Sequence, residues 1–180
     1  MSLTPGSHTI GPDAGTLRVH TFREGVAQKV GHDLIIEVAQ WQVTLDVDEN
    51  GQPTAIALEV DSSSLQVLEG RRGVKPLTDK DRAEIRSNID QKILGRRPIS
   101  FSSSAVEVRD GHLAVQGELS LAGATRPASF PLSVGPDGHL EATIPLTQSE
   151  WGIKPYRALM GALKVRDDVE IVIDVTLPTT

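Results

Sequence analysis

Short runs of alternating apolar and polar residues, separated by tight-turn dipeptides, dominate this chain. The tetrapeptide Asp-Gly-His-Leu occurs twice, at 110–113 and 137–140, and Asn50-Gly51 forms a third dipeptide of the same kind. Asp-Gly and Asn-Gly reach the positive φ angles of hairpin turns, and here they are flanked by runs of period two. The pattern therefore predicts consecutive strands that pair antiparallel.

Eight such segments define the expected fold class. They cover residues 17–19, 34–47, 56–60, 99–108, 113–121, 128–134, 140–146 and 169–177. Eight antiparallel strands are enough for a sheet to close into a barrel that holds one small ligand. We expect an all-β fold built as an eight-stranded antiparallel barrel.

Two of the segments change phase along their length. Apolar residues occupy even positions from Leu34 to Val38 and odd positions from Trp41 to Val47, and a second switch separates Phe101 from Val106. A slip of one residue turns the buried side chains outward unless a bulge absorbs it. We therefore expect bulges on strongly curved strands; the alternative is a sandwich strand buried on both faces.

One segment lacks the period-two alternation of a strand and has the spacing of a helix. Thr78 precedes acidic residues typical of a first helical turn, and Gly95 provides a C-terminal stop. Isoleucines recur at every fourth position between them. We expect one helix over about residues 79–94, lying across an end of the barrel and covering its apolar interior.

Length and composition indicate a single domain over residues 1–180. The 18 basic and 24 acidic residues give a net charge of −6, so neither nucleic acid nor an anionic membrane surface is an expected partner. There is no cysteine, which excludes a disulfide framework and a thiolate metal site. The first ten residues lack the features of a leader and no run reaches bilayer length, so we expect no integral membrane segment and a cytoplasmic location.

Four motifs, in order along the chain, resemble those of the YceI-like family. They are Gly31-His32-Asp33-Leu34, Arg86-Ser87-Asn88 followed by Pro98-Ile99-Ser100-Phe101, the segment Gly117-Glu118-Leu119-Ser120-Leu121-Ala122-Gly123-Ala124-Thr125-Arg126, and Ser149-Glu150-Trp151-Gly152-Ile153. The likeness runs from about Thr9 to Pro178. The family's "R-D-x-H-L" before the helix reads here as Asp81-Arg82-Ala83-Glu84-Ile85, without the histidine.

The resemblance implies a lipocalin-like barrel that holds a long apolar amphiphile. An isoprenoid, an isoprenoid quinone or a fatty-acid-like lipid would be bound and carried or sequestered, without chemistry and with no other cofactor. Because only 3% of the residues are aromatic, we expect mainly aliphatic groups around the ligand.

The expected ligand contacts are bulky apolar side chains on the curved strands and at the mouth. They are Trp41, Val43, Leu58, Phe101, Phe130, Trp151 and Ile153. The strands switch phase, so the sequence leaves open which parity faces inward.

Polar candidates are few. His32 is expected either to hydrogen-bond a ligand headgroup or to fix the preceding turn. Arg72 and Arg97 flank the helix in sequence and predict a cationic rim for an anionic headgroup, unless they lie in ordinary solvated loops. No two of the five histidines share the spacing of paired ligands, so no metal site is expected.

Two other classes of protein stay open. A barrel hydrolase or isomerase would use His20 or His32 as its base, although no serine lies in a nucleophile elbow and no catalytic residue is expected. A ligand-free interaction or stress module would have a filled core. The sequence leaves the oligomeric state open, a homodimer included.

Overall fold

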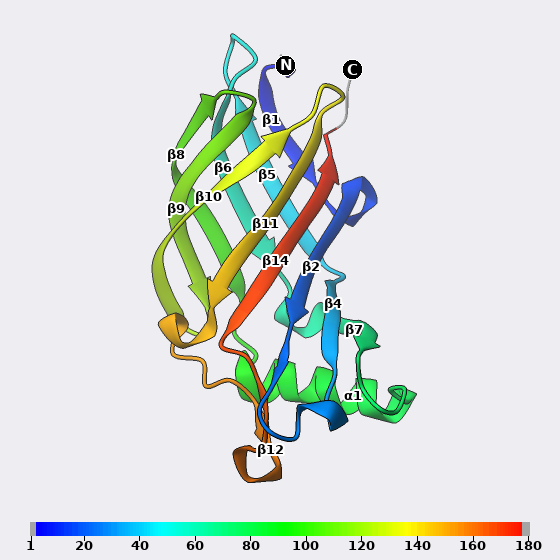
Figure 1. The fold of residues 1–180 in the computed structure, drawn as a ribbon. Helices are drawn as coiled ribbons and strands as arrows, with labels where there is room; N and C mark the ends of the chain where they lie inside the picture. Colours follow the sequence, from blue (N-terminus) through cyan, green and yellow to red (C-terminus); the bar gives the residue numbers. More distant parts are fainter. Residues whose placement is uncertain (1–2, 178–180) are drawn as a thin grey trace.

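The computed structural model describes residues 3–177 and confirms an all-β architecture with one principal helix (Figure 1). The main strands are β1 Gly6–Ile10, β2 Gly15–Thr21, β4 Asp33–Val38, β5 Trp41–Val47, β6 Pro53–Val60, β7 Leu65–Arg71, β8 Ile99–Arg109, β9 His112–Leu121, β10 Ala124–Val134, β11 His139–Thr147 and β14 Asp168–Thr176. They form one antiparallel sheet in the order β1-β5-β6-β8-β9-β10-β11-β14-β2-β4-β7. The sheet is strongly curled into a half-barrel with β1 and β7 at its two edges, and not into the complete barrel that the sequence predicted.

Smaller elements gather mainly at the lower end of Figure 1. A second sheet contains β3 Arg23–Glu24, β12 Arg157–Ala158 and β13 Leu163–Val165. The short 3-10 helices are η1 Pro12–Ala14, η2 Gln28–Val30, η3 Ser62–Ser64, η5 Gln148–Trp151 and η6 Leu159–Gly161. Within residues 3–177, no helix has the length and apolar character needed to cross a bilayer.

The expected count of eight strands is wrong, because the main sheet has eleven. The segment predicted as one strand over 34–47 is two strands, β4 and β5, which lie far apart in the strand order. The segment of β6 likewise continues through η3 into β7, and β1 precedes β2. Each of these three long segments bends and contributes two strands.

The first phase switch marks one of these bends. Between β4 and β5 the Ala39 N–H donates to the Ser64 carbonyl (3.1 Å), and the Asp61 N–H donates to the Gln40 carbonyl (3.0 Å). The two long segments therefore turn together. Ile36 and Val38 face the interior before the bend, and Trp41 faces it afterwards, so the change of parity keeps the apolar side inward.

The second phase switch is a β-bulge, as predicted. The pairing of β8 with β9 shifts register between Ser103 and Ala105, so Ser104 is the extra residue. Gly117 lies opposite, where an added Cβ would come within 2.2 Å of the Ser102 carbonyl oxygen. The bulge therefore requires glycine at this position of β9.

The predicted helix is confirmed as α1 Asp79–Asn88, which continues as the π-helical turn η4 Ile89–Ile93. The Asp81 N–H donates to Thr78 Oγ1 (3.1 Å), and the Thr78 N–H donates to Asp81 Oδ2 (2.9 Å), which completes a capping box. The hydrogen bonds from Thr78 lower the pKa of Asp81 below its ordinary value. The helix lies across the lower end of the half-barrel (Figure 1).

Two arginines attach the helix to the sheet. Arg82 donates to the Leu68 carbonyl of β7 (3.0 Å), and Arg86 donates to the Ser63 carbonyl of η3 (3.0 Å). Leu68 belongs to the last strand of the sheet order, so Arg82 satisfies a backbone group at a sheet edge. The helix is thereby fixed where its apolar side meets the interior, with Ile89 buried in the core.

Candidate ligand-binding cavity

A cavity of about 820 Å³ occupies the interior of the half-barrel. It extends from Ile89 and Ile93 of η4 to the turn between β8 and β9, where Gly111 and His112 border it. This volume lies in the upper part of the range for small-molecule sites. The sheet is therefore wrapped around a space rather than a fully packed core.

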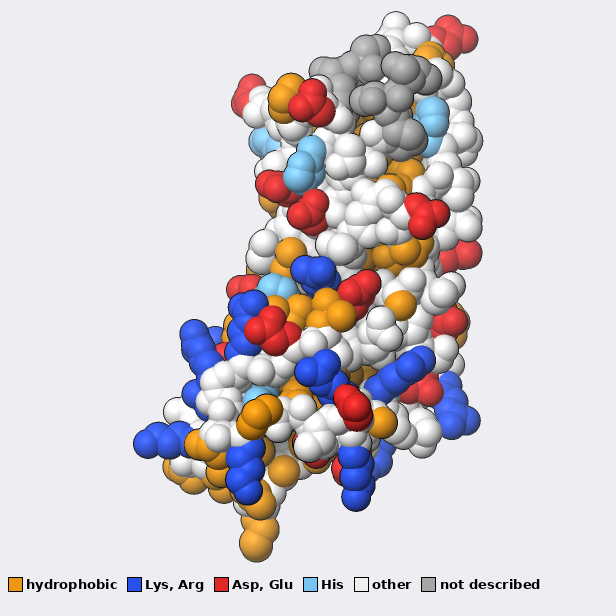
Figure 2. Space-filling view, turned by 90° about the vertical axis from the view of Figure 1, so that its right-hand side faces the viewer, with side chains coloured by type: hydrophobic (Ala, Val, Ile, Leu, Met, Phe, Trp, Pro, Cys, Tyr) orange, Lys and Arg blue, Asp and Glu red, His pale blue; other side chains and the backbone are white. Residues whose placement is uncertain are grey.

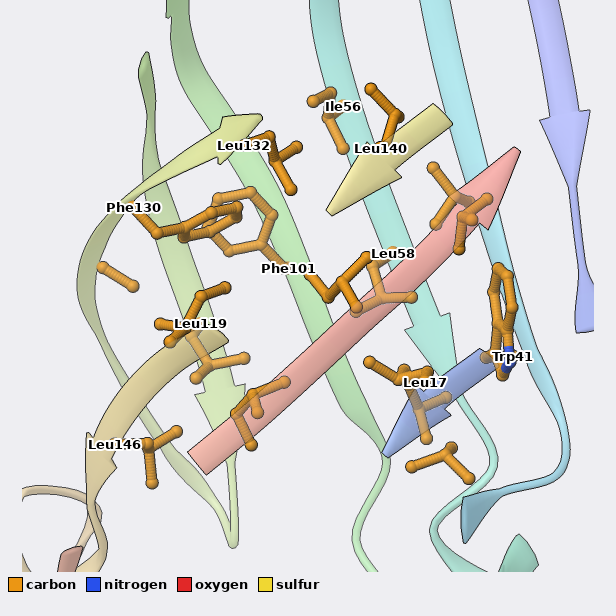
Figure 3. A pocket seen from close by; sticks show the side chains of 18 of the residues that line it. Leu17, Trp41, Ile56, Leu58, Phe101, Leu119, Phe130, Leu132, Leu140 and Leu146 are labelled. Atoms are coloured by element: carbon orange, nitrogen blue, oxygen red, sulfur yellow. The ribbon is translucent and has the colours of Figure 1, made fainter. Parts of the chain in front are cut away.

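The wall of the cavity is almost wholly apolar (Figure 3). Aliphatic side chains predominate, and its four aromatic members are Trp41, Phe101, Phe130 and Trp151. Among the described residues that line it, only His112 and Glu150 carry ionisable side chains. An unpaired charge is costly to bury. This apolar wall therefore suits a ligand whose body is apolar and whose polar group lies outside the cavity.

All seven apolar residues proposed as ligand contacts lie on this wall. They are Trp41, Val43, Leu58, Phe101, Phe130, Trp151 and Ile153. The sequence left open which alternate residues face inward. Prolines apart, the apolar residues that line the cavity have odd numbers on β5 and even numbers on β6, β10 and β11. The residue numbers that face the cavity therefore change between odd and even from one strand to another, while the apolar face of each of these strands points inward.

Two contacts hold the aromatic rings in position. The Trp151 indole N–H donates to the Leu119 carbonyl (3.1 Å), which satisfies the ring's polar group at the wall. The rings of Phe101 and Phe130 pack with centroids 5.3 Å apart and an interplanar angle of 55°. Phe101 is buried and Phe130 is half-buried, so the pair reaches from packed wall to open cavity.

The wall is incomplete between β10 and β11. These strands pair only at Ser133–Glu141 and Val134–Leu140, beside their connecting turn, whereas β9 and β10 pair at ten positions. Side chains from both unpaired stretches, including Ala128 and Leu146, line the cavity. We call this region the seam: residues 127–132 of β10 and 142–147 of β11.

Prolines account for part of the missing pairing. Ala122 (φ 50°) and Gly123 (φ 83°) form the two-residue turn between β9 and β10, so the flanking pair and every second pair beyond it are hydrogen-bonded. Pro127 and Pro131 fall at the alternate positions, where the backbone nitrogen faces the seam. Neither residue has a hydrogen to donate across it, and Pro145 of β11 also lacks one.

The polar candidates lie elsewhere. The His32 ring nitrogen Nε2 is 2.6 Å from the Lys75 carbonyl oxygen, so this side chain holds the loop before the helix. Arg72 is exposed, with its Nε 3.4 Å from an Asp33 carboxylate oxygen, and the Arg97 side chain lies against Gly123. None of His32, Arg72 and Arg97 lines the cavity.

One titratable cluster occurs on the outer face of the sheet. His139 Nε2 lies 3.3 Å from a Glu141 oxygen and 3.0 Å from an Asp174 oxygen. Both carboxyl side chains are exposed, and none of the three residues lines the cavity. The cluster is therefore separate from the cavity.

Sequence reasoning missed two parts of the site. It placed the helix over the interior but did not name Ile89, Ile93 and Leu94 as wall residues, which they are. It also treated β10 and β11 as an ordinary hairpin, although Pro127 and Pro145 were a visible signal of interrupted pairing.

Comparisons with known proteins agree with this architecture. The sequence profile of the YceI-like domain matches residues 13–177, so the chain belongs to the YceI-like family. This family is known for polyisoprenoid-binding proteins and is generally non-enzymatic. A comparison with curated proteins found no significant match.

Solved structures show the same fold at low sequence identity. BcnA of Burkholderia cenocepacia is 15% identical, with a TM-score of 0.57 over 88% of this chain and 94% of that one. The Campylobacter jejuni YceI protein is 12% identical, with a TM-score of 0.57 over 81% of this chain and 84% of that one. At these identities the likeness concerns the fold alone.

Proposed function

We propose that this protein binds one long apolar amphiphile, of isoprenoid or fatty-acyl type, inside the cavity and carries or sequesters it without chemistry. The observation that supports this most directly is an interior space of about 820 Å³ with an aliphatic wall. The seven wall residues from Trp41 to Ile153 named above are the proposed contacts.

The apolar wall favours a long ligand over a short one. Burial contributes about 0.8 kcal/mol for each methylene, so ten methylenes supply about 8 kcal/mol. Association costs about 4–15 kcal/mol in lost freedom. Because the wall offers few polar partners, tight binding requires a chain well beyond ten carbons.

The seam provides the proposed route for the ligand and the place for its polar group. Thr147, Gln148 and Glu150 follow each other at the lower part of the seam and border the cavity. All three lie within four residues of the buried Trp151. A headgroup left there keeps its contact with water while the apolar tail lies inside.

An enzymatic role has less support. The proposed bases were His20 and His32, and neither lines the cavity. His20 lies on β2 between Val19, which faces the cavity, and Thr21, and its alternate position directs it to the outer face. A base on the outside cannot reach a substrate held within.

The test uses two neighbouring residues on opposite faces of β11. Ile144 lines the cavity and Thr143 is exposed, so Ile144→Trp fills the space whereas Thr143→Trp does not. Freshly purified protein is extracted with organic solvent and analysed by mass spectrometry, and affinity for a fluorescent fatty-acyl probe is then measured. We expect an extracted apolar amphiphile and at least tenfold weaker probe binding for Ile144→Trp alone.

Leu58→Trp, on the opposite wall, provides a second filling variant if Ile144→Trp does not fold. Equal probe affinity in wild type, both filling variants and Thr143→Trp would contradict binding in the cavity. Circular dichroism identifies variants that retain the β-sheet signal.

A further inference from the structure

Three loop regions, which include the short elements η2, β12, η6 and β13, are far apart in the sequence but form one surface at the lower end of the molecule (Figure 1). They are residues 25–32, 70–77 and 154–166, and we call this surface the docking face. The Val74 N–H donates to the Lys29 carbonyl (3.2 Å), and the Ala27 N–H donates to the Ala162 carbonyl (2.8 Å). Backbone hydrogen bonds thus join all three loops into one unit.

The docking face holds almost all of the large apolar side chains that the molecule exposes. Six of the seven exposed large hydrophobics of the described chain belong to it: Val26, Val30, Val74, Tyr156, Leu159 and Met160. Val26 is 95% exposed and Met160 is fully exposed. A concentration of this kind marks an interaction surface more than scattered single residues do.

The backbone directs two of these side chains outward. Leu159, Met160 and Gly161 have successive φ angles of 51°, 58° and 88°, at the tip of the loop that connects β12 and β13. Positive φ is costly for leucine and methionine, and such conformations persist only where the surrounding structure enforces them. The backbone therefore fixes this loop tip in a conformation that projects its apolar side chains from the lower end.

The charge of the docking face is opposite to that of the whole chain. Its three loops contain one, three and four Lys or Arg residues respectively, eight in total, and no Asp or Glu, whereas the chain has a net charge of −6. Arg71 and Arg72 pair with Glu69 and Asp33; the other six have no ion-pair partner within residues 3–177. Figure 2 shows Lys and Arg side chains gathered around the lower end and hydrophobic ones at its tip.

The docking face is continuous with the cavity. Ile153 is buried and lines the cavity, and the next residue, Lys154, is exposed and begins the third loop. The same chain segment comes from η5, which borders the lower part of the seam. A surface that met the docking face would therefore lie beside the proposed route of the ligand.

We propose that the docking face attaches the protein reversibly to an anionic lipid bilayer, with Leu159 and Met160 inserted among the headgroups and the surrounding cations against lipid phosphates. An apolar projection bordered by lysine and arginine combines the two contributions that hold proteins at such interfaces. The remainder of the chain contains 10 basic and 24 acidic residues, a net charge of −14, and is repelled by the same surface. Attachment therefore has one orientation.

The purpose of this attachment, exchange of an apolar ligand with the bilayer, rests on the proposed function. The attachment itself does not, and it is measured on delipidated protein. Vesicles of phosphatidylcholine are compared with vesicles in which about 30% of that lipid is replaced by phosphatidylglycerol. We expect cosedimentation with the anionic vesicles, little with the neutral ones, and a steep loss of binding as salt is added.

Paired variants separate the two contributions. Leu159→Ser with Met160→Ser should weaken binding to anionic vesicles at least tenfold, and Lys154→Gln with Arg157→Gln about thirtyfold. Val108→Ser is the matched control, because Val108 is the seventh exposed hydrophobic of the described chain and belongs to the last residues of β8, a strand that ends at the opposite end of the molecule (Figure 1). It should leave binding unchanged, and circular dichroism checks that each variant is folded.

Several results would overturn the proposal. These are equal binding to neutral and anionic vesicles, equal binding by the variants and wild type, and a dimer in light scattering that the Leu159 and Met160 substitutions dissociate. The last result would assign the docking face to a second copy of the chain. Vesicle binding that fails while an amphiphile is extracted from the purified protein would reject docking and leave the proposed carrier function in place.

Discussion

The lower end of the half-barrel and the seam both bring the apolar interior close to solvent, but they are constructed differently. The lower end is closed by side chains of η4 and by the attachment of α1 to Leu68 and Ser63. The seam lacks backbone hydrogen bonds over most of its length. One boundary is sealed by packing and the other is left open by strand geometry, which is why we propose the seam as the route of the ligand.

The largest expected effect contrasts the packed wall with the seam. Phe101 is buried with Leu113, Val115 and Leu132, so Phe101→Ala should cost about 3–5 kcal/mol of unfolding free energy. Phe130 is half-buried at the seam, and the same change there should cost less than half as much. Urea unfolding of both variants measures the difference, and equal losses would show that the seam is as tightly packed as the wall.

The next effect concerns the sealed end. Ile89 is buried, so Ile89→Ala should lower the unfolding free energy by about 2–5 kcal/mol. Ile85→Ala, one turn earlier and half-buried, serves as the control and should cost less. If release of a bound probe accelerates in proportion to the destabilisation at Ile89, the ligand leaves through the lower end and the contrast fails.

Amide hydrogen exchange can resolve the seam itself. Strand β9 is paired on both sides, so its amides should be protected without interruption. Residues 142–147 of β11 pair only with β14, so protected and exposed amides should alternate apart from Pro145, which has no amide hydrogen, with at least tenfold faster exchange at the exposed ones. Continuous protection across 142–147 would mean that the seam closes in solution.

The smallest effect comes from the helix cap. Thr78→Ala should cost about 1 kcal/mol of stability and leave the probe release rate unchanged if the ligand passes through the seam. The pKa of Asp81 is lowered in the folded protein by its hydrogen bonds with Thr78. Its contribution is therefore present above the ordinary aspartate pKa and is lost as the pH falls through the lowered value.

Acid titration of thermal stability checks this last expectation. The wild type should lose the contribution of the cap toward low pH, and Asp81→Asn should flatten that part of the profile. An unchanged profile in Asp81→Asn would show that other groups account for the acid sensitivity of the helix.

Local signals in the sequence predicted the parts of the fold that depend on local geometry. The phase change after Val38 located a bend, the change after Phe101 located the bulge at Ser104, and Thr78 located the start of the helix. The strand count failed because β1 has weak alternation and because alternation in β7 is limited to Leu65 and Val67. Pairing partners of bent segments also depend on contacts that are distant in sequence.

The candidate site was predictable only where it consists of strand interiors. Trp41 and Phe130 follow from alternation, but the seam depends on the divergence of two strands that begin as an ordinary hairpin. The docking face was hidden for a different reason. Net charge averages over the whole chain, whereas folding brings Lys29, Lys75 and Lys154 together in loops without acidic residues.

The prolines of the seam have a further consequence for how copies of this protein behave at high concentration. An unpaired strand normally presents a row of N–H donors on which another extended chain can assemble. Of the three backbone nitrogens that residues 127–131 direct to the open side of β10, Pro127 and Pro131 remove two donors and leave only that of Ser129, and Pro145 removes one from β11. The half-barrel can therefore keep a permanent opening in its wall without offering a template for fibrous aggregation.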